Sequence, residues 1–397
     1  MNPTHSDAHW MTMALGLALR GRGAVEPNPM VGCVLVRDGE LLAQGYHRRF
    51  GGPHAEIDAL QQLPDRELAR GATAYVTLEP CCHTGKTPPC TGALIEAGLA
   101  RVVVPIRDPF PRVAGGGLRE LEEAGIRVDV GVEADAAQHL LAPYLKRITR
   151  RRPWVIAKWA MTLDGRIATV TGDSQWISGQ LSRDEVHRTR AKVDAILVGG
   201  GTALADNPTL TPRLPQNVDQ AEPDAQELNI DNLDPTMFRR PPLRIVLAGH
   251  RIPTVDCNLM RTLDQAPLLI VVPKSATPEP LVPLVTAGAK VFRCYTDDRI
   301  GMVNDLLDEL GLRQMTYLLV EGGGSVLGSF AAAGEIDETH VYIGPKLVGG
   351  HAAPGPVGGN GIEKLAQAPD WQIESVCRFD DDVRVIARKK LAPLPTR

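Results

Sequence analysis

The chain has 397 residues, more than one hydrophobic core usually serves, so its length predicts two domains. Apolar residues make up 43% and charged residues 23%, as in an ordinary soluble globular protein. The formal net charge of −4 leaves no overall positive field for nucleic acid or an anionic membrane, so we expect neither as a partner, although it does not exclude a local basic patch.

Residues 1–23 contain a short apolar stretch, but no basic segment precedes it. Trp10, Met13, Ala14 and Leu17 recur at helical spacing, which favours an amphipathic core helix over a signal peptide. No apolar run reaches the length of a membrane span. The seven cysteines are an odd number and are thinly spread outside one cluster, which predicts a protein of the reducing cytoplasm rather than a secreted disulfide scaffold.

The first part of the chain alternates strand and helix signals. In order, the patterns predict a hairpin over 30–47, a helix over 54–63, a strand over 72–80 that stops at Pro80, a helix over 90–100, a strand over 101–106, and a helix followed by a strand over 115–132. This alternation predicts a largely parallel sheet with helices packed on it.

A basic, poorly periodic stretch, KRITRRRP, covers residues 146–153, and we expect the domain boundary there. Residues 214–241 are acidic and rich in proline and asparagine, which indicates a long surface loop without an assigned role. The prediction is two α/β domains, at 1–148 and 149–397. The elements predicted for the second are a strand over 153–165, a helix over 182–194, a strand with a glycine turn over 195–201, and strands over 243–249, 267–273, 289–295 and 315–325.

A cysteine cluster lies in the segment TLEPCCHTGKTPPC, residues 77–90. Zinc takes about four ligands and favours thiolate and imidazole, and a catalytic site keeps one position for water. Cys81 and Cys90 flank a loop between a predicted strand and the next helix, and His54 begins another helix. These three residues predict a zinc site with one open position.

Glu56 lies two residues beyond His54, on a different face of the same predicted helix. It can therefore reach a bound water, whose pKa zinc lowers towards neutrality, without ligating the metal. We expect Glu56 to be the catalytic residue that carries a proton to a leaving amine. Two alternatives stay open: Cys82 ligates in place of Cys81, or the site is a closed structural one that recruits Cys82 or His83 as fourth ligand.

The His-x-Glu and Pro-Cys…Cys pattern is similar to that of zinc nucleobase deaminases. The long spacing in PCCHTGKTPPC, together with EPNPMVGCVLV (26–36) and GYHRRFGGPHAE (45–56), resembles the bifunctional deaminase/reductase family of riboflavin biosynthesis. The resemblance implies a cytidine-deaminase-like α/β/α layer and a pyrimidinone substrate that carries a ribosylamino 5′-phosphate. An amide and imidazoles suit a heterocycle edge, and a lysine suits a phosphate. The residues implied to hold base and phosphate are Asn28, His47, His83 and Lys86.

The segment YLLVEGGGSVLGSF (317–330) indicates a buried strand that ends at Glu321, a glycine turn, and a helix from about Ser325. Glycines let a pyrophosphate approach the backbone, and a helix N-terminus offers free N–H groups. Because the spacing is not G-x-G-x-x-G, the segment carries no Rossmann fingerprint. A glycine run alone is equally compatible with a plain tight turn.

Together with VIAKWAMTLDGRIAT (155–169), GDSQWIS (172–178) and VGGGTALADNPTLTPR (198–213), this segment resembles the reductase domain of the same family, which implies a dihydrofolate-reductase-like fold and NADPH as cofactor. The implied NADPH contacts are Ala160, Trp176, Thr202, Asp206, Gly323, Gly324, Ser325, Val326, Leu327, Gly328 and Ser329. The implied substrate contacts are Ser174, Arg190, Leu210, Arg213 and Glu321, with Lys158 as a further polar group near the reacting carbon. The two arginines suit a phosphate, although either one alone is compatible with a solvated charge, and Trp176 with a core residue.

These patterns predict two consecutive steps of riboflavin synthesis: zinc-dependent deamination of a diaminopyrimidinone ribosyl phosphate, then reduction of its ribosyl group to ribityl by NADPH. The nearest alternative is a deaminase with a degenerate reductase half. A nucleic-acid-editing deaminase would need a basic stripe and would leave the second half without a role, and a non-catalytic binding protein would not need the complete ligand set with Glu56. The resemblance also implies a homo-oligomer formed through the reductase half.

Overall fold

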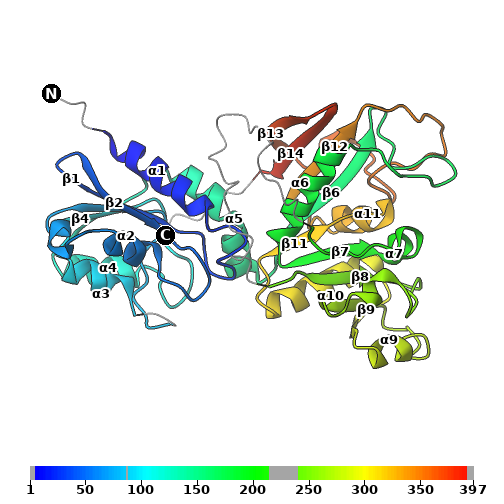
Figure 1. The fold of residues 1–397 in the computed structure, drawn as a ribbon, viewed down its shortest axis with the longest axis horizontal. Coiled ribbons are helices and arrows are strands. Elements are labelled where there is room, and N and C mark those ends of the chain that lie inside the picture. Colours follow the sequence, from blue (N-terminus) through cyan, green and yellow to red (C-terminus); the bar gives the residue numbers. More distant parts are fainter. Residues whose placement is uncertain (1–4, 86–87, 214–239, 391–397) are drawn as a thin grey trace. The chain divides into compact units, whose positions relative to one another are not determined.

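The computed structural model describes residues 5–85, 88–213 and 240–390 (Figure 1). Lys86, predicted to contact a phosphate, and most of the predicted loop 214–241 lie outside the described residues. The chain divides into two compact units, one up to Arg150 and one from Arg151 onward. No helix among the described residues is long and apolar enough to cross a membrane.

The first unit is built on a five-stranded sheet in the order β2-β1-β3-β4-β5. The predicted hairpin is confirmed as the antiparallel pair β1–β2, and β3, β4 and β5 run parallel as predicted. Only the antiparallel pairing of β1 with β3 differs from the prediction, and it makes the sheet mixed rather than largely parallel. After β2 the chain crosses over through α2, so β3 runs in the same direction as β2. β3 does not pair with β2, however, but lies on the other side of β1, to which it is antiparallel. The elements are α1 (Asp7–Leu19), β1 (Gly32–Arg37), β2 (Glu40–Tyr46), α2 (Ala55–Gln61), β3 (Thr73–Val76), α3 (Cys90–Glu96), β4 (Arg101–Val104), α4 (Gly116–Glu123), β5 (Arg127–Val130) and α5 (Ala134–Arg150).

Alternate residues of the central strand β1 enter two separate cores. Cys33 and Leu35 join α2, α3 and α4 on one face, whereas Val34 and Val36 join α1 and α5 on the other. Such alternation follows from the two-residue repeat of a strand. The helix predicted near the N-terminus is confirmed as α1, and the predicted α/β/α layering is confirmed.

The basic stretch 146–153, where the domain boundary was expected, is helical as far as Arg150, because it forms the last turns of α5, and the two units divide after this residue. Leu141, Tyr144 and Leu145 are buried along this helix, and the aliphatic part of Lys146 is buried with them. The basic residues therefore belong to a packed, amphipathic helix. Their charges hide the helical spacing of its apolar residues in the sequence.

The second unit contains a nine-stranded sheet in the order β10-β9-β8-β7-β11-β6-β12-β14-β13. The strands from β10 to β12 are parallel, and β14 and β13 add an antiparallel edge. This confirms a second α/β domain. Its elements are β6 (Trp154–Thr162), α6 (Gln180–Ala191), β7 (Ala195–Gly199), α7 (Gly200–Asp206), β8 (Leu243–Leu247), α8 (Asn258–Arg261), β9 (Leu268–Val272), α9 (Val282–Thr286), β10 (Lys290–Arg293), α10 (Arg299–Leu312), β11 (Tyr317–Val320), α11 (Gly324–Ala332), β12 (Glu338–Gly344), β13 (Trp371–Phe379) and β14 (Asp382–Lys389).

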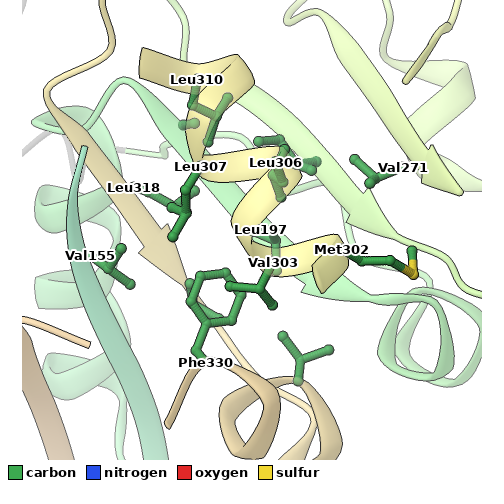
Figure 2. Packing of buried hydrophobic residues seen from close by; sticks show 14 of the residues in the cluster. Val155, Leu197, Val271, Met302, Val303, Leu306, Leu307, Leu310, Leu318 and Phe330 are labelled. Atoms are coloured by element: carbon green, nitrogen blue, oxygen red, sulfur yellow. The ribbon is translucent and has the colours of Figure 1, made fainter. Parts of the chain in front are cut away.

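One face of this sheet carries the main core of the unit (Figure 2). Leu306 and Leu307 of α10 and Phe330 of α11 pack against sheet residues such as Leu197 and Leu318, all nearly or fully buried. Because parallel strands present their carboxyl ends at one edge, the turns after β7, β8 and β11 lie at the same edge of the sheet.

Candidate active sites

The structure brings His54, Cys81 and Cys90 together. His54 is the residue before α2, Cys90 is the first residue of α3, and Cys81 lies in the loop that follows β3. His54 Nδ1 is 3.5 Å from Cys81 Sγ and 3.3 Å from Cys90 Sγ, and the three ligand atoms lie within 4.8 Å of one another. Zinc bonds of about 2.0–2.3 Å in a tetrahedron place ligand atoms about 3.5–3.8 Å apart, so this set fits one zinc ion.

The adjacent cysteine points away from this cluster. Cys82 Sγ lies 3.7 Å from the carbonyl oxygen of Arg112, and Cys82 is absent from the one metal-binding group found among the described residues. That group has three members, so it leaves room for a non-protein ligand. The geometry thus favours Cys81 over Cys82 and an open site over a closed one.

Hydrogen bonds within the cluster decide which sulfur is ionised in the metal-free protein. The Cys90 thiol and His54 lower the pKa of Cys81 to about 4, despite its partial burial. The hydrogen bond to Cys81 in turn raises the pKa of His54. The cluster therefore holds an anionic sulfur ready for a cation before any metal arrives.

Glu56 is the second residue of α2 and is 3% exposed. Burial raises the pKa of its carboxyl, and the negative charge of Cys81 raises it further. Together with His54 and Cys81, it lines a cavity of about 240 Å³. A buried carboxyl whose pKa is raised holds a proton more readily than an exposed one, which suits general acid–base catalysis.

The same cavity contains Asn28, His47 and His83. His47 Nδ1 donates to the Pro53 carbonyl at 2.8 Å, so its Nε2, 3.2 Å from Asn28 Nδ2, accepts from the amide. Burial lowers the pKa of His47 to about 4, which keeps its ring neutral. The structure therefore presents Asn28 and His47 as a linked pair on the cavity wall.

Sequence reasoning missed Asp108, a buried carboxylate that also lines the cavity. It accepts from the Tyr144 hydroxyl at 2.9 and 3.1 Å and from the Phe110 N–H at 2.9 Å. Burial raises its pKa to about 6. The available signal was a polar residue shortly after the predicted strand 101–106, since the carboxyl ends of parallel strands form sites.

In the second unit, Glu321 follows β11 and meets Arg190 of α6. Arg190 Nε and Nη2 donate to the two Glu321 oxygens at 2.5 and 2.8 Å, and both side chains are mostly buried. Burial would raise the pKa of Glu321, but Arg190 and Lys158 lower it. Two of the Arg190 guanidinium nitrogens are therefore already hydrogen-bonded to Glu321, not to a phosphate.

Lys158 of β6 lies beside this ion pair, and its Nζ is 5.6 Å from the centre of the Tyr342 ring. Burial lowers the pKa of Lys158. The negative charge of Glu321 partly offsets this effect, and the positive charge of Arg190 adds to it. Arg213 is exposed, and its backbone N–H donates to His187 Nδ1 at 3.1 Å, whereas Leu210 is 2% exposed. Of the two arginines, Arg213 is the one available for a phosphate.

Two glycine turns face each other at the ends of the adjacent strands β7 and β11. A Cβ atom at Gly323 would lie 2.9 Å from Thr202 Oγ1, and one at Gly199 would lie 2.6 Å from Val326 Cγ2. Gly323 also has a left-handed backbone with φ of +79°. The absent side chains let the two turns pack directly against each other, because any Cβ atom at these positions would collide with the facing element.

The other residues predicted to contact NADPH differ in exposure. Trp176 is 59% exposed, which rules out a core role, and its ring lies 4.6 Å from the Arg183 guanidinium. Val326 and Leu327 both pack into the core, and the Val326 side chain also packs against Gly199 at the end of β7. The remaining residues predicted to contact NADPH are Ala160 on β6, Asp206 at the end of α7, and Gly324, Ser325, Gly328 and Ser329 on α11, of which Gly328 is buried. Ser174, predicted to contact the substrate, lies between β6 and α6 and is half-buried.

Comparison with known proteins covers nearly the whole chain. Residues 153–385 match the RibD C-terminal domain, and residues 4–106 match the cytidine and deoxycytidylate deaminase zinc-binding region. The riboflavin biosynthesis protein RibD of Actinobacillus pleuropneumoniae is 39% identical over 96% of this chain and 94% of its own length, and that of Escherichia coli K12 is 39% identical over 95% and 98%.

Solved structures agree with these sequence matches. RibD of Acinetobacter baumannii superposes with a TM-score of 0.81 at 34% identity, over 97% of this chain and 99% of that one. A Thermotoga maritima protein described as a diaminohydroxyphosphoribosylaminopyrimidine deaminase/5-amino-6-(5-phosphoribosylamino)uracil reductase gives a TM-score of 0.76 at 33% identity, with the same coverage.

Proposed function

The chain belongs to the RibD family, as a bifunctional deaminase and reductase of riboflavin biosynthesis that uses zinc and NADPH, and we propose how its residues divide the two reactions. We assign the deaminase to residues 1–148 and the reductase to residues 149–397. The relatives match both halves, so a degenerate reductase is not favoured. The substrates we propose are those in the description of the Thermotoga protein: 2,5-diamino-6-(5-phosphoribosylamino)pyrimidin-4-one, then 5-amino-6-(5-phosphoribosylamino)uracil.

The deaminase assignment rests on one observation: Glu56 is buried beside the converging His54, Cys81 and Cys90 in a single cavity. Zinc held by those three residues would supply a water that ionises near neutral pH. With zinc bound, Glu56 would be placed to accept a proton from that water and to pass it to the departing amine. Asn28 and His47 hold the heterocycle through its polar edge, with His83 on the same wall and Lys86 assigned to the phosphate.

In the reductase, NADPH supplies the hydride, and the protein supplies orientation and charge. The facing glycine turns near Thr202 and Gly323 hold the cofactor phosphates, with Ala160, Trp176, Asp206 and the start of α11 along its length. Arg213 binds the substrate phosphate. Arg190 holds Glu321 in position next to Lys158, so that this carboxylate can contact the ribosyl hydroxyls. Ser174 and Leu210 complete the substrate contacts.

The chain also offers a surface for self-association, and we propose a homo-oligomer formed through the reductase unit. β13 is the edge strand of the nine-stranded sheet, with Ile373 63% and Val376 56% exposed. An open edge strand with apolar side chains is suited to pairing with another copy. We further propose a cytoplasmic location, in keeping with the seven unpaired cysteines.

The test is to incubate the zinc-loaded protein with the diaminopyrimidinone ribosyl phosphate, with and without NADPH, and to identify the products by mass. We expect the deaminated compound alone without NADPH, and its ribityl derivative with NADPH. Glu56→Gln removes the proton carrier, so ammonia release should fall by at least about a hundredfold. NADPH oxidation on supplied deaminated substrate should be unchanged in this variant, and its loss would contradict two separate sites.

A further inference from the structure

A fully buried arginine lies outside both sites described above. Arg244, on the inner strand β8, is 0% exposed. Among the described residues, its guanidinium donates hydrogen bonds only to carbonyl and hydroxyl oxygens. Burial lowers its pKa. A buried charge without a carboxylate partner is costly, so its hydrogen bonds must do the stabilising.

Those hydrogen bonds join two segments that are distant in sequence. Nη1 donates to the Thr209 carbonyl at 3.0 Å and to Thr262 Oγ1 at 2.5 Å. Nη2 donates to the Thr262 carbonyl at 2.9 Å and to the Ala266 carbonyl. The planar fork of an arginine can satisfy these separate acceptors at once, which a lysine cannot. Arg244 therefore ties Thr209 to the turn that follows α8.

Thr209 belongs to a segment, residues 207–213, that is held at two further points. Asn207 accepts from the Asn258 N–H and, through its carbonyl, from the Asn258 amide, both at 2.7 Å. The Arg213 N–H donates to His187 Nδ1 at 3.1 Å. Asn207 and Leu210 both adopt left-handed backbones, with φ of +42° and +54°. Asparagine adopts this conformation readily at a helix end, whereas a leucine keeps it only where its surroundings impose it, as at Leu210.

The end of this segment reaches the reductase site. His187, which accepts from Arg213, lies close enough to Arg190, Arg213 and Glu321 for their charges to shift its pKa. Leu210 directly follows the residue that Arg244 binds. A displacement of the Thr209 carbonyl would therefore move both Leu210 and Arg213 relative to the Arg190–Glu321 pair.

We propose that Arg244 is a positioning residue of the reductase: it fixes segment 207–213 and so places Leu210 and Arg213 for the sugar phosphate substrate. This rests on the proposed assignment of those two residues to that substrate. Arg244 itself lies beneath the segment and touches neither substrate nor cofactor.

The test measures steady-state reduction of enzymatically prepared 5-amino-6-(5-phosphoribosylamino)uracil by the full chain carrying Arg244→Met or Arg244→Lys. We expect KM for this substrate to rise at least about tenfold while kcat changes less than about threefold, because the chemical groups remain. The Kd for NADPH, measured by fluorescence titration, and ammonia release by the deaminase should match the wild type. Should the methionine variant not fold, the lysine variant carries the test, since one ammonium cannot bridge Thr209 and Ala266.

Two further variants separate the possible failures. Arg152→Met removes a largely buried arginine that pairs with Asp308 and Glu335, away from segment 207–213, and should leave KM unchanged. Arg213→Gln should raise KM on its own. An unaltered KM in Arg213→Gln would overturn the substrate assignment, and the Arg244 role with it. A raised KM in Arg213→Gln with wild-type KM in both Arg244 variants, or a loss of stability alone, would overturn only the role of Arg244.

Discussion

At the scale of single residues, neighbouring cysteines have opposite surroundings. Cys81 Sγ lies against His54 and Cys90, whereas Cys82 Sγ faces the Arg112 carbonyl across a loop. Two successive residues in an extended segment point to different sides, so only one can enter the cluster. A variant of Cys82 can therefore serve as the control for the same substitution at Cys81.

Cys81→Ser should therefore lose zinc, and Cys82→Ser should keep it. A serine hydroxyl is a poor zinc ligand at neutral pH, so zinc content should fall from about one ion per chain to near zero, with ammonia release lost. Metal analysis after gel filtration measures this directly. Equal zinc loss in both variants, or loss in the Cys82 variant alone, would show that the ligand assignment is wrong.

The role of a residue could be predicted where a short sequence pattern indicates it, but not where it depends on a partner that is distant in the chain. His54, Glu56, Cys81 and Cys90 stand out because metal and proton chemistry demand particular residue types at short spacing. Arg190 was predicted to bind a phosphate. Its ion pair with Glu321 could not be predicted from local sequence, because the two residues are 131 positions apart. For Asp108 the local signal, a polar residue shortly after a predicted strand, was weak, because its burial and its contact with Tyr144 depend on the fold.

At the scale of elements, one carboxylate organises the start of α4. Glu79 is 4% exposed and accepts from four backbone N–H groups, those of Asp108, Gly115, Gly117 and Leu118, at 3.0–3.3 Å. It thereby joins the loop after β3, the loop after β4 and the first turn of the helix. It acts as a remote N-cap, since the residue before α4 is a glycine with no side chain to offer.

Glu79→Gln should destabilise the first unit by about 2 kcal/mol, because the amide keeps only one acceptor oxygen and loses the charge that favours a helix N-terminus. Urea unfolding followed by circular dichroism measures the change. Asp65→Ala, at the exposed start of the 3-10 helix Arg66–Ala69, is the control and should cost less than about 1 kcal/mol. Equal effects in the two variants would contradict the special role of Glu79.

Elements with strong periodicity were predictable, and their pairing was not. The strands up to β11 were located because runs such as residues 267–273 are apolar between turn residues. The later strands β12, β13 and β14 were not predicted. The antiparallel placement of β1 beside β3 depends on which sheet edge the chain returns to after α2, which local sequence does not encode. Helix α5 was not predicted, because its charged residues concealed the apolar side of the helix.

At the scale of the whole molecule, the two units have separate cores and separate sites. Treatment with a zinc chelator should therefore abolish ammonia release and lower the first unit's thermal transition, because the metal binds only the folded cluster. NADPH oxidation on supplied deaminated substrate should be unaffected. Calorimetry and the two assays on one chelated sample test this. Parallel loss of both activities, restored together by zinc, would contradict it.

The strand order of the second unit also constrains how the chain folds as it is made. β6, at residues 154–162, pairs with β11 and β12, which end near residues 320 and 344, whereas the strand pairings of the first unit close within residues 32–130. A ribosome must therefore extend the polypeptide by more than 150 residues before β6 gains either neighbour. The deaminase half can assemble while translation continues, but the centre of the reductase sheet cannot form until well over half of that unit has been made.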